Sequence, residues 1–187
     1  MAFVVIYDAC VLYPAPLRDL LLRIARTGLV RARWSEQILE ECFRNIVQNR
    51  SDLKPEALQR TRELMNQAVP DCLVHRYENL IEGLSLPDQN DRHVLAAAIR
   101  AGAQAIVTFN LSDFPDKLLV PYNVEAKHPD DFVLDQLDLA SGAVVNVIIE
   151  QTQSLKNPPR TISQLLDTLR DNGLVQSVAK LRELLGR

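Results

Sequence analysis

The sequence predicts an α/β fold with a mostly parallel central sheet, followed by an all-helical C-terminal extension. Two short apolar runs, at residues 3–7 and 105–109, have the length and composition of strands that are buried on both faces of a sheet. Segments with helical apolar spacing alternate with such runs, which is the order of elements typical of α/β folds. Beyond about residue 130 only helical patterns remain.

The first third of the chain alternates strand and helix. A strand is expected at residues 3–7, a helix from Leu17 to Thr27 that stops at Gly28, and a second strand at residues 29–34. Ser35 can cap the next helix, which has apolar positions at residues 38, 39, 42, 43, 46 and 47. Pro55 to Ala68 is expected to form another amphipathic helix.

The remaining elements follow from the same patterns. A weak strand is expected near Leu73 and Val74, and a short helix at residues 77–81. The segment 87–101 predicts a helix that Asp88 caps and Gly102 ends, and strands follow at 105–109 and 123–126. Helices are then expected at 132–139, starting at Asp130 or Asp131, and at 144–155, 162–170 and 175–185. We therefore expect an α/β domain over residues 1–130 and a helical extension over residues 131–187.

Composition narrows the class of protein. The chain of 187 residues is 47% apolar and 24% charged, as in an ordinary soluble protein. Apolar runs such as residues 3–7 are much shorter than the roughly 20 residues that a membrane span requires, and the N-terminal segment lacks the basic flank of a secretory signal. We expect a cytoplasmic protein without a membrane partner.

The cysteine and histidine residues do not suggest a zinc site or a disulfide framework. Cys10, Cys42 and Cys72 include no Cys-x-x-Cys pair and are expected in the core, and the three histidines include no His-x-x-x-His pair. A metal ion would therefore need oxygen ligands.

Basic residues are unevenly distributed in this chain of net charge −3. Residues 1–62 contain ten Lys and Arg against seven Asp and Glu, whereas residues 63–187 contain eleven against seventeen. Nine of those first ten are arginines, whose planar guanidinium groups suit phosphate. Arg23, Arg33 and Arg44 are candidates for contacts with an RNA backbone, although solvated helix faces explain any one of them equally well.

Acidic residues occupy the positions where an α/β sheet places its reactive groups. Asp8 ends the first strand, Asp91 lies in the first turn of the helix at 87, and Asp113 follows the strand at 105–109. Glu41 lies on a helix at the border of the apolar face. Carboxylates brought together repel one another unless a cation joins them, and an all-oxygen set favours Mg²⁺ or Mn²⁺.

Each of these residues also has a structural explanation. Asp88 and Asp91 could cap a helix, and Asn110 and Asp113 could belong to an ordinary loop. Glu41, like Glu40, could be a solvated helix residue. Asp8 is the hardest to explain in this way, because an acid directly after a buried strand needs a partner.

Four segments together resemble the PIN-domain ribonucleases over about residues 2–130. They are Tyr7-Asp8-Ala9-Cys10-Val11-Leu12, the helix from Ser35 to Glu41, the segment from Asp88 to Ala98, and Thr108-Phe109-Asn110-Leu111-Ser112-Asp113-Phe114. The register of the second segment selects Glu41 over Glu40, and Asp88 corresponds to a frequent accessory of Asp91. Cys10 departs from the family, in which Asn is more usual.

The resemblance implies a three-layer α/β/α sandwich, and the particular branch is similar to VapC-type toxins with a helical C-terminal extension. It implies an Mg²⁺- or Mn²⁺-dependent endoribonuclease that a small antitoxin protein inhibits. Asp8, Asp91 and Asp113 would ligate the ion, with Asn110 and Asp88 as further contacts, and Glu41 would orient or deprotonate the attacking water. The C-terminal extension could cover the core, form a homodimer, or receive an antitoxin helix.

Other functions fit less well. A haloacid-dehalogenase phosphatase needs a second Asp where Cys10 stands, and a Cys-dependent phosphatase needs Arg where Pro16 stands. A dinucleotide-binding loop needs glycines, which residues 9–16 lack. The stronger alternative is a catalytically silent PIN-fold module that binds RNA or a partner, but an acidic cluster at the centre of an RNA-binding surface argues against it.

Overall fold

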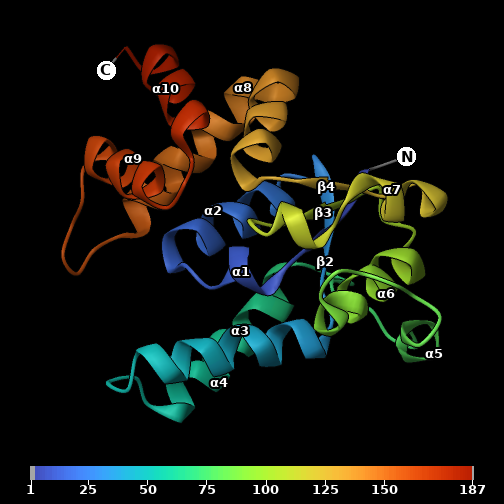
Figure 1. The fold of residues 1–187 in the computed structure, drawn as a ribbon. Coiled ribbons are helices and arrows are strands. Elements are labelled where there is room, and N and C mark those ends of the chain that lie inside the picture. The colour runs from blue at the N-terminus through green and yellow to red at the C-terminus, as the bar shows by residue number, and fades with distance from the viewer. Residues whose placement is uncertain (1–2, 187) are drawn as a thin grey trace.

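A parallel sheet of four strands forms the centre of the computed structural model, which describes residues 3–186 (Figure 1). The strands are β1 (Phe3–Tyr7), β2 (Val30–Arg33), β3 (Ala105–Val107) and β4 (Glu125–Lys127), in the order β2-β1-β3-β4. All three pairings are parallel. The predicted α/β class is therefore confirmed.

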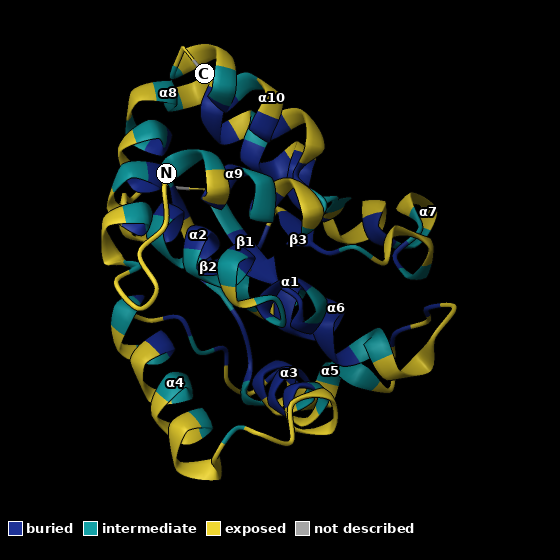
Figure 2. Cartoon of the chain, turned by 90° about the vertical axis from the view of Figure 1, so that its left-hand side faces the viewer, coloured by how far each residue is buried: buried dark blue, intermediate teal, exposed yellow. Residues whose placement is uncertain are grey.

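Helices cover the sheet on both sides. Helix α2 (Ala15–Arg26) packs against β2, and α6 (Arg92–Ala101) packs against β1 and β3 from the opposite side (Figure 1). The other elements before residue 129 are α1 (Ala9–Leu12), α3 (Glu36–Asn49), α4 (Pro55–Ala68), α5 (Glu78–Ile81), η1 (Gln89–Asp91), η2 (Leu111–Asp113), α7 (Asp116–Leu119) and η3 (Val120–Tyr122). Strands β1 and β3 lie in the buried interior, whereas most of α4 is at the surface (Figure 2).

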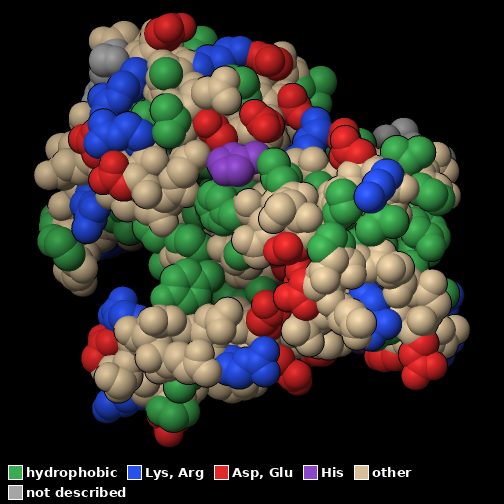
Figure 3. Space-filling model, in the orientation of Figure 1, with side chains coloured by type: hydrophobic (Ala, Val, Ile, Leu, Met, Phe, Trp, Pro, Cys, Tyr) green, Lys and Arg blue, Asp and Glu red, His purple; other side chains and the backbone are tan. Residues whose placement is uncertain are grey.

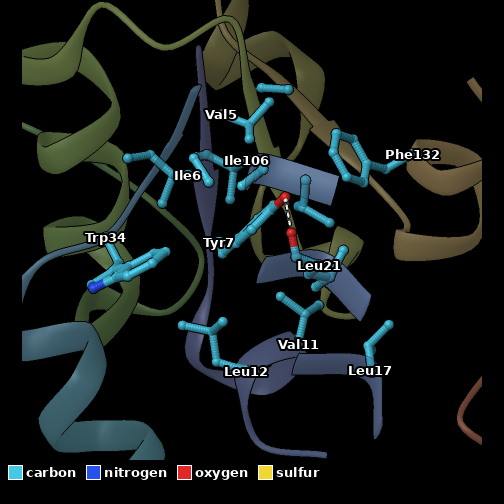
Figure 4. Close-up of a cluster of buried hydrophobic side chains, with 14 of the residues drawn as sticks. Val5, Ile6, Tyr7, Val11, Leu12, Leu17, Leu21, Trp34, Ile106 and Phe132 are labelled. Carbon is cyan, nitrogen blue, oxygen red and sulfur yellow. Dashed lines mark hydrogen bonds between the residues drawn. The ribbon is translucent and has the colours of Figure 1, made fainter. Parts of the chain in front are cut away.

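Tyr7 is at the centre of the core (Figure 4). Its ring stacks on Trp34 at 6.4 Å between centroids and meets the edge of Phe132 at 5.9 Å. Its hydroxyl donates a hydrogen bond of 3.1 Å to the carbonyl of Leu21, which satisfies the one polar atom of this buried side chain. These contacts hold the end of β1, where Asp8 follows, against α2 and the C-terminal helices.

The C-terminal region is helical, as expected, and it packs onto the sheet domain. It comprises α8 (Pro129–Ser154), α9 (Ile162–Asp171) and α10 (Val175–Leu184). Helix α8 is long and apolar enough to cross a membrane, but Ala140 interrupts it with φ −153° and ψ 66°. Its buried residues pack against α2, α9 and α10, and Gln151 donates a hydrogen bond to the carbonyl of Pro16 at 2.9 Å. We therefore describe α8 as a core helix.

The buried carboxylate of Asp130 joins the two ends of this region. Its two oxygens accept hydrogen bonds of 2.8 Å from the backbone N–H groups of Gln176 and Ser177, in the first turn of α10. These N–H groups have no partner within their own helix, and the helix dipole favours a negative charge at this end. Asp130 therefore caps a helix that is remote in the sequence.

Several predicted elements differ from the structure, including the helices expected at 132–139 and 144–155, which form the single helix α8. The helix expected at 87–101 begins as the 3₁₀ turn η1, capped by Asp88, and becomes α-helical only at Arg92. Leu73 forms a single bridge to Trp34 instead of a strand. Helix α8 begins at Pro129 with His128 as its cap, not at Asp130 or Asp131, because the Asp130 carboxylate is used by α10. The two expected domains, residues 1–130 and 131–187, include residues 1, 2 and 187, which lie outside the described part of the chain.

Gly173 lies where the C-terminal region meets the end of β3. Its φ is +99°, and a Cβ atom at this position would be 3.0 Å from Cε1 of Phe109. The Phe109 ring in turn meets the edge of the His128 ring, with 5.2 Å between centroids. The position therefore requires glycine for both backbone conformation and space.

We predict that Gly173→Ala lowers the free energy of unfolding by about 1–3 kcal/mol, because strain at positive φ adds to the contact with Phe109. Two matched variants separate these causes. Gly102→Ala introduces strain at φ +61° without a close contact, and Gly142→Ala introduces neither. Urea unfolding should rank the variants Gly142→Ala, Gly102→Ala, Gly173→Ala in order of decreasing stability. Equal stability of the last two would contradict the role of Phe109.

Candidate active site

The pairing of β1 with β3 places Asp8 beside Thr108. Tyr7 is paired with Val107, and the backbone N–H of Asp8 donates to the carbonyl of Val107 at 3.1 Å. Asp8 and Thr108 are therefore the first residues beyond two neighbouring parallel strands, at the edge of the sheet where ligands usually bind. The Thr108 hydroxyl donates to Oδ2 of Asp8 at 2.8 Å.

Asp8 is buried and hydrogen-bonded through both oxygens. Oδ1 accepts from the backbone N–H of Ala9 at 2.7 Å, and Oδ2 accepts from the Cys10 thiol at 3.4 Å as well as from Thr108. A carboxylate has about four acceptor positions, so one remains free on Oδ1. Asp8 is thus fixed in orientation but can still accept one more ligand or donor.

Cys10 takes a polar role that the sequence did not indicate. Its sulfur lies 3.3 Å from the Thr108 hydroxyl and accepts from the backbone N–H of Phe109 at 3.3 Å. Burial, with the neighbouring Asp8 charge, raises the pKa of Cys10 to about 12, so the group stays a thiol and donates to Asp8. Cys42 and Cys72 are buried in the core, as expected, but Cys10 is only partly buried.

Asp91 lies among four other carboxylates. Burial raises its pKa from its ordinary value to about 7, with further contributions from the charges of Asp8, Asp88, Asp113 and Glu41. Burial is also the main cause of the raised pKa of Asp8, which the hydrogen bonds from Thr108, Ala9 and Cys10 oppose. All five of the acidic residues that the sequence singled out therefore lie near enough to interact electrostatically, and Glu41, Asp88 and Asp91 also line one cleft.

A cleft of about 800 Å³ opens at Asp91 between α3, α5 and α6. Acidic side chains are visible in the middle of this face (Figure 3). The cleft is lined by Glu36, Gln37, Glu40, Glu41, Arg44, Tyr77, Glu78, Asp88, Asn90, Asp91 and His93. It is an open, polar and mainly acidic cavity.

Glu41 and Glu40 differ within this cleft. Oε2 of Glu41 lies 3.5 Å from Nε2 of the buried His93, and the side chain of Glu41 is 34% exposed. Glu40 is exposed and also borders a second depression, between α3 and α4. The motif register selected Glu41 over Glu40. Of these two glutamates, Glu41 is the one that is held near Asp91.

Of the other residues that the sequence singled out, some lie at the site and some lie away from it. Asp113 is half-buried in η2, and the backbone N–H of Asn110 donates to the Thr108 hydroxyl at 3.0 Å, although the Asn110 residue is exposed. Arg44 lines the cleft. Arg23 instead pairs with Asp19 and Glu150 beside α8, and Arg33 donates to the carbonyl of Asp71. The structure does not bring these last two arginines to the cleft.

The carboxylates fit a hard divalent cation. Within residues 3–186 no three His, Cys, Asp or Glu side chains are already grouped as metal ligands. Mg²⁺ nevertheless needs only one or two carboxylates and completes its shell with water and phosphate oxygens. Asp8 has one free acceptor position, and the half-buried Asp91 is destabilised by neighbouring negative charges, so these two carboxylates can supply the ligands. Oxygen ligands do not favour zinc.

Sequence reasoning missed two residues of this site, Thr108 and His93. Thr108 carries a fully buried hydroxyl within the run 105–109, directly after β3, which is the same position relative to its strand that Asp8 occupies. His93 is a buried polar residue at the start of the apolar face of α6. A polar side chain at a position patterned for the core was the available signal in both cases.

Comparison with known proteins agrees with this geometry. A family model described as the PIN domain matches residues 4–112, which include most of β1, all of β3, and the candidate residues Asp8, Glu41, Asp88 and Asp91 but not Asp113. The chain belongs to the PIN-domain family. A second model, described as the VapC50 C-terminal domain, matches residues 129–183 of this PIN-domain protein. The resemblance that the sequence motifs indicated is confirmed.

A named relative extends the comparison. The chain is 47% identical over 108 residues to "Putative ribonuclease VapC50" of Mycobacterium tuberculosis (strain ATCC 25618 / H37Rv). The match covers 58% of this PIN-domain chain and 63% of the relative, so it spans less than two thirds of that protein. No solved structure matches this chain.

The raised pKa of Asp91 predicts a pH-dependent stability. Between about pH 4 and pH 7 the carboxyl ionises in the unfolded chain but remains protonated in the folded one, so the free energy of unfolding falls as pH rises through this range. Asp91→Asn should remove this penalty. In EDTA we expect the variant to be more stable than the wild type at pH 8, with a smaller advantage at pH 5.

Urea unfolding at several pH values measures this difference. Glu63→Gln, which alters an exposed carboxylate in the middle of α4, is the matched control and should leave the shape of the stability–pH curve as in the wild type. Parallel curves for Asp91→Asn and the wild type would contradict the assigned pKa.

Proposed function

We propose that this PIN-domain protein is a metal-dependent endoribonuclease, which hydrolyses RNA phosphodiester bonds with Mg²⁺ or Mn²⁺. The observation that carries the proposal is the position of Asp91, which is half-buried at an open cleft and feels the negative charges of Asp8, Asp88, Asp113 and Glu41. This arrangement destabilises the protein unless a cation is bound, which favours a functional role. The name of the VapC50 relative supports the choice of RNA as substrate.

Asp8 and Asp91 are the residues that would hold the ion, with Asp113 ligating directly or through water. Thr108 and Cys10 keep the Asp8 carboxylate in one orientation, so its remaining acceptor position faces one direction. Asn110 and Asp88 would supply further polar contacts. A bound ion would lower the pKa of a coordinated water and offset charge on the phosphate.

Glu41 is suited to act on the attacking water. It lies on α3, across the cleft from the start of α6, and its carboxylate is partly exposed. A carboxylate in this position can orient a water molecule and accept its proton as the new P–O bond forms. The leaving oxygen of the RNA then takes a proton from solvent, to which the cleft is open.

Arg44 is the candidate for holding the RNA backbone. It is exposed and lies on the same helix as Glu41, about one turn further along, where it lines the cleft. A guanidinium group can donate two hydrogen bonds to one phosphate and offset the repulsion between RNA and the carboxylates. Arg23 and Arg33 do not line the cleft, so we give them no part in the reaction.

The non-enzymatic alternative explains less of the site. A protein that only binds RNA gains affinity from positive charge. The carboxylates of this cleft would repel the RNA phosphates and weaken binding. A surface that only binds RNA also has no need for the hydrogen bonds that orient Asp8. The set is better explained by chemistry at a phosphate.

We further propose that the protein is the toxin of a toxin–antitoxin pair in the cytoplasm, and that a small antitoxin protein inhibits it. The support is the match of both parts of the chain to VapC-type sequences. The proposal is independent of the oligomeric state.

Single substitutions of the carboxylates test the proposed nuclease. We expect Asp8→Asn and Asp91→Asn to lower Mg²⁺-dependent cleavage of a labelled RNA by about 10²-fold or more, because each removes a charged ligand. Glu41→Gln should cost a similar factor, in the range of about 10²–10⁴ for a lost general base. Glu40→Gln, on the adjacent residue, is the matched control and should cleave nearly as well as the wild type. Cleavage that persists in both Asp variants would refute the assignment.

Arg44→Ala tests the RNA contact separately. RNA affinity, measured on the inactive Asp91→Asn background, should fall, and the slope of log K against log salt should become shallower by about 0.7, as expected for one lost phosphate contact to a single strand. Arg26→Ala, an exposed arginine on α2 away from the cleft, should leave the slope unchanged. Equal slopes for Arg44→Ala and the wild type would exclude this contact.

A further inference from the structure

His93 connects the two helices that face each other across the acidic cleft. It lies in the first turn of α6, two residues after Asp91, and its side chain is only 4% exposed. Its Nε2 atom is 3.5 Å from Oε2 of Glu41 on α3. A buried imidazole therefore meets one of the carboxylates that surround Asp91.

The bonding of the ring indicates how His93 acts. Nδ1 is buried and has no hydrogen-bond partner among the described residues. A proton on Nδ1 would leave a buried donor without an acceptor, which destabilises the folded state. The ring is therefore best satisfied with its N–H on Nε2, the nitrogen that lies 3.5 Å from the Glu41 carboxylate.

The contact distinguishes Glu41 from its neighbour. Successive residues of an α-helix point about 100° apart, so Glu40 and Glu41 cannot occupy the same place in the cleft. Glu40 is exposed, whereas Glu41 is paired with His93. The contact with α6 thus distinguishes Glu41 from Glu40 beside Asp91.

We propose that His93 is a positioning residue, which holds the Glu41 carboxylate in the orientation needed for the reaction. The inference rests on the proposed function, because Glu41 is the group that acts on the water. An error of about 1 Å in the position of such a group can cost about 10²-fold in rate. A donor on a buried ring restricts the movement of the carboxylate that would cause such an error.

Two amide variants test the role of the Nε2 donor. Glutamine has its amide nitrogen as many bonds from Cα as Nε2 is, whereas asparagine has it at the position of Nδ1. We expect His93→Asn to lower kcat for RNA cleavage by tenfold or more with little change in KM, and His93→Gln to recover most of that loss. Equal impairment of the two variants, or no impairment in His93→Asn, would overturn the proposal.

A second measurement does not require cleavage. In EDTA, the shift in the urea midpoint for the double variant His93→Asn/Glu41→Gln should be smaller than the sum of the two single shifts, because both substitutions remove the same contact. Additive shifts would overturn the proposal. If His93→Asn does not fold, His93→Met, which has a long side chain without an N–H donor, takes its place in both experiments.

These outcomes are separable from failure of the proposed function. If wild-type protein does not cleave RNA, or if Asp8→Asn and Asp91→Asn cleave normally, the nuclease assignment fails, and the proposal for His93 fails with it even if the midpoints show coupling. If those controls behave as expected, the comparison of glutamine with asparagine at position 93 decides the role of His93 alone.

Discussion

The parallel pairing of β1 with β3 is the constraint on which the site depends. It makes Asp8 and Thr108 neighbours although 100 residues separate them in the chain. A shift of one residue in this register would turn the Asp8 side chain to the other face of the sheet and separate it from the hydroxyl. The buried contacts of Tyr7 with Trp34, Phe132 and the Leu21 carbonyl oppose such a shift.

The site carries an electrostatic cost that the rest of the fold offsets. Burial and mutual repulsion raise the pKa of both Asp8 and Asp91, so the ionised site weakens the folded state. The protein retains these charges beside a densely packed apolar core, with Tyr7 and Val107 directly before the polar residues. Stability comes from the interior of the sheet, and the charges are confined to its carboxyl edge.

The sequence was informative where periodicity determines structure, and less so where distant side chains meet. The strand at residues 3–7 and the helix Pro55–Ala68 follow from local pattern, and both are present. The contact between His93 and Glu41 depends on how α3 and α6 pack, which no local pattern encodes. The same holds for Asp130, which looked like the start of its own helix but caps another 46 residues away.

The join between the two parts of the chain has a consequence for how this protein can change in evolution. One family model matches most of the sheet domain and another matches the C-terminal region, as expected if the two parts could be combined with other partners in evolution. Yet a Cβ atom at Gly173 of the C-terminal region would meet the ring of Phe109, whose backbone N–H donates to Cys10 beside Asp8. If the C-terminal region were replaced by that of another lineage, the new region would need a compatible residue at position 173. Otherwise position 109 of the sheet domain would have to change as well. The two parts are therefore expected to diverge together.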